Sequence, residues 1–212
     1  MLTFVASLLI LTQQALSPDA YRLNRQGKEL LEQRRYAAAA RAFEKAVDLA
    51  DSELGAGDPA TAMMLRNLAL AQVHGGNLAA AEQTAARALS IMEEKFGMSD
   101  PALTPILNVL AECYASGGRI ADAQRLSERA VSMGSDAGVH YGIALQNLGA
   151  IHEYSGDFVV ASSFYRKAIA VKSEALGAAH PHVALSKSAL RRVDGSQQIA
   201  ARSGSLKLEQ GE

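Results

Sequence analysis

The sequence repeats itself with a step of 42 residues. An alanine-rich segment begins at Tyr36 and returns at Leu78, Ile120 and Phe158, so the successive steps are 42, 42 and 38 residues. A fixed period of this length is typical of a stacked array, in which each unit buries its apolar face against the next. Such arrays present surfaces, and most of them do no chemistry. Three columns of small residues keep the same register: Gly27, Ala69, Ala111 and Gly149; Ala39, Ala81, Ala123 and Ala161; Ala46, Ala88, Ala130 and Ala168.

Each unit is predicted to form two helices joined by a turn. In the third unit, Leu107, Leu110 and Tyr114 have the three- and four-residue spacing of one helical face. Small residues in matched columns let the two helix axes approach closely. Glycine marks the turn, because it reaches positive φ without steric cost. The turn glycines are Gly75-Gly76, Gly117-Gly118 and Gly156, whereas the first unit has Gln33-Arg34-Arg35 at this place.

A capping signal predicts where the next unit begins. In Asp58-Pro59 and Asp100-Pro101 the carboxylate is expected to cap a helix whose first residue is proline, and His180-Pro181 occupies the same column. The predicted units span about 20–59, 60–101, 102–137 and 138–181, with a terminal helix over 182–193. The third link is four residues short, which accounts for the step of 38. The polar stretch 194–212 is predicted to be disordered.

The repeat pattern resembles the tetratricopeptide repeat family. Leu148-Gly149, then Ala161 and Tyr165, then Ala168 and a later Pro181, follow the order of that family's motif. The 42-residue step, with Leu-Gly pairs at Leu54-Gly55 and Leu176-Gly177, resembles the longer kinesin-light-chain type. The resemblance implies an all-α, right-handed α-solenoid of four helix hairpins plus a terminal capping helix. It also implies a concave groove, lined by the first helices, that binds peptides.

Two interpretations apply to the apolar N-terminus, residues 1–17. As a signal peptide, cut near Ala15-Leu16-Ser17 or kept as a membrane anchor, it would place the protein in the periplasm or outside the cell. As a helix that caps the first repeat, it would leave the protein in the cytoplasm. No Lys or Arg precedes the apolar run, and Pro18 would hinder cleavage. With 21 basic and 22 acidic residues, the net charge of −1 predicts no binding to nucleic acid.

The sequence predicts no catalytic residue, cofactor or metal. His180 and His182 could suggest a metal pair, but His180 occupies the N-cap column and no acidic or cysteine ligands complete a set. Cys113 stands in a packing column with Ala71 and Ile151, and no motif supplies a base for it. The chain is therefore not expected to be an enzyme.

The candidate site is the predicted groove. One column of polar residues lies inside otherwise apolar first helices, and amide side chains can pair with both groups of an extended peptide backbone. The alternative is that this column is simply solvated. The expected partner is a protein or an extended peptide; self-assembly and a regulatory role on a partner enzyme are the alternative functions. The lysine and asparagine set of the family's chaperone-tail clamp is not reproduced by Asn24 and Lys28. The candidate groove residues are Asn24, Lys28, Arg66, His74, Asn108, Glu112, Gln146 and Tyr154.

Overall fold

The computed structural model describes residues 16–210, which form nine α-helices and two short 3₁₀ helices without any strand in that range. The all-α prediction is confirmed. None of these helices is long and apolar enough to cross a membrane. The elements are α1 (Pro18–Glu32), α2 (Tyr36–Leu54), α3 (Pro59–His74), α4 (Leu78–Phe96), η1 (Pro101–Leu103), α5 (Thr104–Ser116), α6 (Ile120–Ser132), η2 (Ser135–Ala137), α7 (Val139–Tyr154), α8 (Phe158–Leu176) and α9 (Pro181–Gln210).

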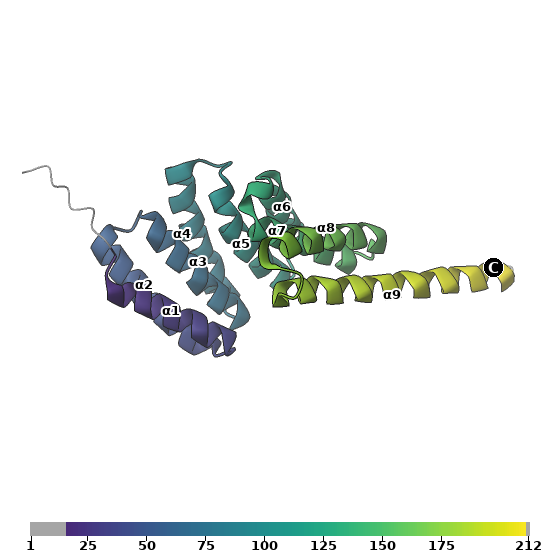
Figure 1. The fold of residues 1–212 in the computed structure, drawn as a ribbon, viewed down its shortest axis with the longest axis horizontal. Coiled ribbons are helices and arrows are strands. Elements are labelled where there is room, and N and C mark those ends of the chain that lie inside the picture. Colours follow the sequence, from purple (N-terminus) through teal and green to yellow (C-terminus); the bar gives the residue numbers. More distant parts are fainter. Residues whose placement is uncertain (1–15, 211–212) are drawn as a thin grey trace, which may run out of the picture.

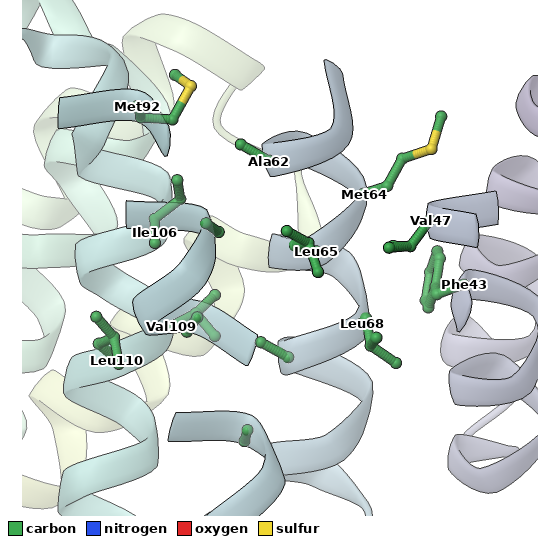
Figure 2. Close-up of a cluster of buried hydrophobic side chains, with 14 of the residues drawn as sticks. Phe43, Val47, Ala62, Met64, Leu65, Leu68, Met92, Ile106, Val109 and Leu110 are labelled. Atoms are coloured by element: carbon green, nitrogen blue, oxygen red, sulfur yellow. The ribbon is translucent and has the colours of Figure 1, made fainter. Parts of the chain in front are cut away.

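The helices stack as pairs in a row. Figure 1 shows α1 and α2 at one end of the row, α7 and α8 at the other, and α9 packed beside α8 before it projects beyond the rest. In Figure 2, α3 stands between neighbours, with Phe43 and Val47 of α2 on one side and Ile106 of α5 on the other. The apolar interior therefore continues from α2 through α3 to α5, and each of these helix pairs relies on the next for its cover.

The three columns of small residues are buried, as the periodicity predicted. The two glycines among them sit against aromatic rings. A Cβ atom on Gly27 would lie 2.5 Å from the ring of Phe43, and one on Gly149 would lie 2.8 Å from the ring of Tyr165. These distances are too short for a real carbon contact, so any side chain at either position would force the ring to move.

The turns and caps follow the sequence signals. Gly76, Gly118 and Gly156 have φ of 80°, 77° and 82°, and Arg34 takes the same left-handed place in the first unit with φ of 58°. The backbone N–H of Ala60 donates to Asp58 Oδ1 at 2.7 Å. The N–H of His182 donates to His180 Nδ1 at 3.2 Å, so His180 serves as the N-cap of α9.

The first helix begins with the same kind of cap. The N–H of Ala20 donates to Ser17 Oγ at 3.3 Å, and Pro18 is the first helical residue. Residues 1–15 lie outside the described residues, so the signal-peptide and capping-helix interpretations both stay predictions.

The terminal helix is longer than predicted. The sequence placed its end at Val193 and a disordered tail after it, but α9 continues to Gln210. Val193 is fully buried, and Asp194 accepts a 2.6 Å hydrogen bond from Ser162 Oγ and lies 3.5 Å from Arg166. Contacts to α8 therefore continue to Asp194, one residue past the predicted end. The polar composition concealed this, because the contacts come from single residues rather than from an apolar stripe.

A ladder of ion pairs links the second helices. Arg87 on α4 donates to both carboxylate oxygens of Asp51 on α2, at 2.7 and 2.8 Å. Arg129 on α6 donates to Glu93 on α4 at 2.5 Å. Both partners of the second pair lie 42 residues after those of the first, so the pairs are equivalent. The ladder ends there, because α6 has 13 residues where α2, α4 and α8 have 19.

The buried apolar residues divide into two clusters. The larger runs from Leu16 to Ala144 and joins the first three helix pairs to the start of α7. The smaller consists of Ala161 and Tyr165 on α8 with Ala189 and Val193 on α9. The last helices are thus packed around a core of their own.

Candidate functional site, a cavity between the first helices and α9

A cavity of about 710 Å³ lies between α3, α5, α7 and α9. It is the place where the predicted concave wall meets the terminal helix. Its apolar lining includes Leu70, Val109, Ile143 and Leu185, one from each of the four helices. Polar side chains gather at the two ends of this apolar strip. The cavity therefore offers both apolar surface and hydrogen-bonding groups, as binding sites generally do.

Six of the eight predicted groove residues line this cavity: Arg66, His74, Asn108, Glu112, Gln146 and Tyr154. Asn24 and Lys28 do not. They line a separate hollow on α1 together with Tyr21. Asn24 Oδ1 accepts a 2.8 Å hydrogen bond from Asn67, so it is tied to the neighbouring helix. The repeat columns predicted a continuous row, but the cavity is closed only where α7 and α9 cover it.

The polar column is less solvated than the sequence suggested. Asn108 is only 5% exposed, and its Nδ2 donates to the carbonyl of His140 at 2.9 Å. Gln146 Oε1 accepts from Lys172 Nζ at 2.7 Å and from Ser186 Oγ at 2.6 Å. The alternative that the column is simply solvated therefore does not hold at Asn108. These residues help to hold the helices as well as to line the cavity.

Three buried polar atoms of the lining have no hydrogen-bond partner among the described residues. They are Arg66 Nε on α3, Asn108 Oδ1 on α5 and Asn147 Nδ2 on α7. Two of these atoms are donors and one is an acceptor. A buried polar atom without a partner costs about 1–3 kcal/mol. These atoms have almost no accessible surface, so an occupant with N–H and C=O groups could remove that cost once the three side chains turn toward the cavity.

One end of the cavity is basic. Arg66, His140 and His182 line it, and Lys172 lies beneath its floor with no exposed surface. Burial lowers the pKa of Arg66 and lowers that of Lys172 to about 8. Burial, with the charges of Arg66 and His182, lowers the pKa of His140 to about 4. No carboxylate among the described residues forms a salt bridge with this cluster.

Sequence reasoning missed Lys172, although a signal was present. Lys172 stands in the column of Ala50 and Met92, both of which are buried. A lysine in a core column is unusual, because a charge is costly to bury. Gly142 on α7 makes room for it, since a Cβ there would lie 2.8 Å from Lys172 Cγ.

The other end of the cavity carries its own charge pair. His74 Nδ1 on α3 lies 3.6 Å from Glu112 Oε1 on α5. Burial raises the pKa of the Glu112 carboxyl, and His74 partly offsets this. Tyr154 stands at the rim of the cavity and is 77% exposed. The two ends of the cavity thus differ. Glu112 has a basic partner in His74, whereas Arg66 and Lys172 at the basic end have no acidic partner among the described residues.

The repeat pattern is shared with a known family. The sequence pattern of the tetratricopeptide repeat matches residues 23–94 and 102–190, which is more than half of the chain. The chain belongs to the tetratricopeptide repeat family. The resemblance seen in the sequence is confirmed, and no curated protein sequence matches the chain beyond this.

Solved tetratricopeptide-type structures share the fold. BtubC (BKLC) from P. vanneervenii has a TM-score of 0.62 and 21% identity over 76% of this chain, which spans 66% of that protein. A putative kinesin light chain from Podosopora anserina, with nearly identical TPR-like repeats, has a TM-score of 0.64 and 17% identity, covering 86% and 90%. A Rap protein complexed with competence and sporulation factor has a TM-score of 0.71 and 15% identity, covering 90% and 53%.

The remaining candidates of this tetratricopeptide array have structural explanations. Cys113 is buried and its Sγ lies 3.4 Å from the carbonyl of Leu78. Burial raises the pKa of the Cys113 thiol, which disfavours the nucleophilic thiolate. Between residues 16 and 210, no group of three or more His, Cys, Asp or Glu side chains could hold a metal ion.

Proposed function

We propose that the protein is a non-catalytic binding scaffold that holds an extended segment of a partner protein in the cavity between α3, α5, α7 and α9. The observation that carries the proposal is the set of buried polar atoms without partners: Arg66 Nε, Asn108 Oδ1 and Asn147 Nδ2. They come from three successive helices, so a chain crossing those helices could meet each in turn. Backbone N–H and C=O groups are the pairs that such atoms require.

The apolar strip supports the same kind of ligand. Leu70, Val109 and Ile143 lie between the polar ends and could cover apolar side chains of an extended segment. Tetratricopeptide repeat proteins are generally interaction scaffolds, and the Rap protein of similar fold is complexed with a factor. Cys113, the one cysteine, is held in the packing between helices, so we assign it no catalytic role.

The proposal can be tested by blocking the cavity. Ala150 lines the cavity and is exposed, so Ala150→Trp should fill it without disturbing the core. Ala121 on α6 is equally exposed but does not line the cavity, so Ala121→Trp is the matched control. A displayed library of random 12-residue peptides would be selected against the wild type and both variants. We expect the selected peptides to bind Ala150→Trp more than about tenfold more weakly than the wild type, which is equivalent to about 1.4 kcal/mol of binding free energy.

The same selection distinguishes the alternative functions. If Ala150→Trp retains the same peptides as the control, the ligand does not use the cavity and the proposal fails. A second outcome is that no peptide is selected and sedimentation shows a dimer in the wild type and in both tryptophan variants. Self-assembly then replaces peptide binding as the function. Circular dichroism of both variants checks that the helices are intact.

A further inference from the structure

The basic end of the cavity carries two fixed positive charges without an anionic partner among the described residues. Lys172 Nζ has only neutral neighbours, Gln146 Oε1 at 2.7 Å and Ser186 Oγ at 3.2 Å. Arg66 donates from Nη2 to the neutral amide of Asn67 at 2.5 Å, and its Nε has no partner. Paired charges normally compensate the cost of burial, and here none of the described residues does so.

Basic side chains share one end of the cavity. Arg66 Nε is buried without a described partner, and His140 and His182 line the same end. The ammonium of Lys172 uses two of its three N–H groups and lies beneath the floor. Its charge acts on the cavity through a medium of low dielectric, where electrostatic interactions are stronger than in water.

We propose that this end of the cavity binds a phosphoryl dianion. The inference rests on the proposed function, since it gives the partner segment a phosphorylated side chain. A phosphoryl group carries close to two negative charges at neutral pH and has three acceptor oxygens. Two negative charges balance the two positive charges of Arg66 and Lys172, whereas a single carboxylate leaves one uncompensated. The three oxygens also provide acceptors for Arg66 Nε and for both imidazole rings.

The end of the cavity that carries Glu112 and His74 sets the orientation of the ligand. Glu112 with its His74 partner disfavours an anion there, because a second negative charge would face that carboxylate. The phosphoryl group therefore belongs at the end formed by α3, α7 and α9, above the floor of α8. The apolar strip then contacts the partner residues that flank the phosphorylated residue on one side.

The first test uses inorganic phosphate as the probe, with the full chain labelled for NMR of its histidine side chains. Titration with phosphate against chloride at matched ionic strength should move the signals of His140 and His182 and leave His152 unmoved. Lys172→Met and Arg66→Gln should each weaken phosphate by about tenfold or more, because charge-assisted bonds are the strong ones. Lys28→Met, which removes an exposed lysine outside the cavity, is the matched control and should bind as the wild type does.

Two results would overturn the inference. One is equal shifts of all five histidines, which indicates non-specific ion binding. The other is acetate binding as tightly as phosphate, which indicates a carboxylate site. Retained phosphate affinity in a folded Lys172→Met variant would also contradict it.

The second test separates this inference from the proposed function. Three 12-residue libraries, random except for a fixed central serine, glutamate or phosphoserine, are selected against the wild type and Lys172→Met. We expect the phosphoserine library to be enriched about tenfold or more over the others on the wild type alone. Equal enrichment of all three libraries leaves the scaffold function standing and refutes the phosphoryl site. Phosphate binding without enrichment of any library supports a site for free phosphate and refutes the peptide function.

Discussion

Replacing Lys172 by methionine should make the protein more stable. The Lys172 side chain has no exposed surface, and its ammonium contacts two neutral oxygens. Burial lowers its pKa from 10.5 to about 8. Each pKa unit corresponds to about 1.4 kcal/mol between the charged and neutral forms, so burying the charge costs about 3 kcal/mol at neutral pH.

Methionine keeps most of the packing that the lysine stem provides beside Gly142. The hydrogen bond from Ser186 Oγ to Gln146 Oε1, at 2.6 Å, survives the change, so Gln146 keeps a partner. The variant loses the bonds of the ammonium, a loss of about 1 kcal/mol. The expected gain in the free energy of unfolding is therefore about 2 kcal/mol, which is a rise in Tm of about 4–8 °C for a chain of this size.

The pH dependence gives the argument a second check. The folded pKa of Lys172 lies below the unfolded one, so between pH 8 and 10.5 the unfolded state binds more protons. This term makes the wild type gain stability as pH rises through that window. The advantage of Lys172→Met should be full at pH 7 and mostly gone at pH 10. Urea unfolding followed by circular dichroism at both pH values measures it. A variant less stable than the wild type at pH 7, or an equal gap at both, would refute the reasoning.

Three further changes test the array itself. Ala123→Arg should lower the free energy of unfolding by about 3 kcal/mol or more, because Ala123 is fully buried, while Ala121→Arg on the exposed face should leave thermal melting unchanged. Asn108→Ala should lower stability by about 1–2 kcal/mol, because it removes the bond to the His140 carbonyl, and urea titration should show no change if that bond is unimportant. Arg34→Gly should raise stability by about 1 kcal/mol, since Arg34 has φ of 58°, and an unchanged Tm would mean that the turn carries no strain.

The sequence predicted what repeats and missed what departs from the repeat. Ala123 could be placed inside because three other units have a small residue in its column, and the period converts directly into burial. The buried Lys172 is an exception in its column. A repeat pattern is defined by what its columns share, so it does not reveal a residue that differs from the others. The contact between Asp194 on α9 and Ser162 on α8 joins residues separated by 32 positions, and no local pattern encodes it.

The candidate site was predicted in part for the same reason. Arg66, Asn108 and Gln146 belong to one column and line one cavity. Asn24 belongs to that column too, but α1 lies beyond the part that α7 and α9 close. The repeat column predicts the helix face on which a residue lies. It does not predict where α7 and α9 cover that face and form a cavity.

The division of the buried apolar residues into two clusters has a mechanical consequence. The first three helix pairs share one core and are cross-braced by the ladder that ends at Arg129, whereas α8 and α9 share a second core. The cavity is lined from both groups of helices, by Arg66 on α3 and by His182 on α9. An occupant that touched both residues would resist a change in the angle between α3 and α9. Because α9 runs on past α8, a small change in the angle of α9 would become a large displacement of its C-terminal end (Figure 1).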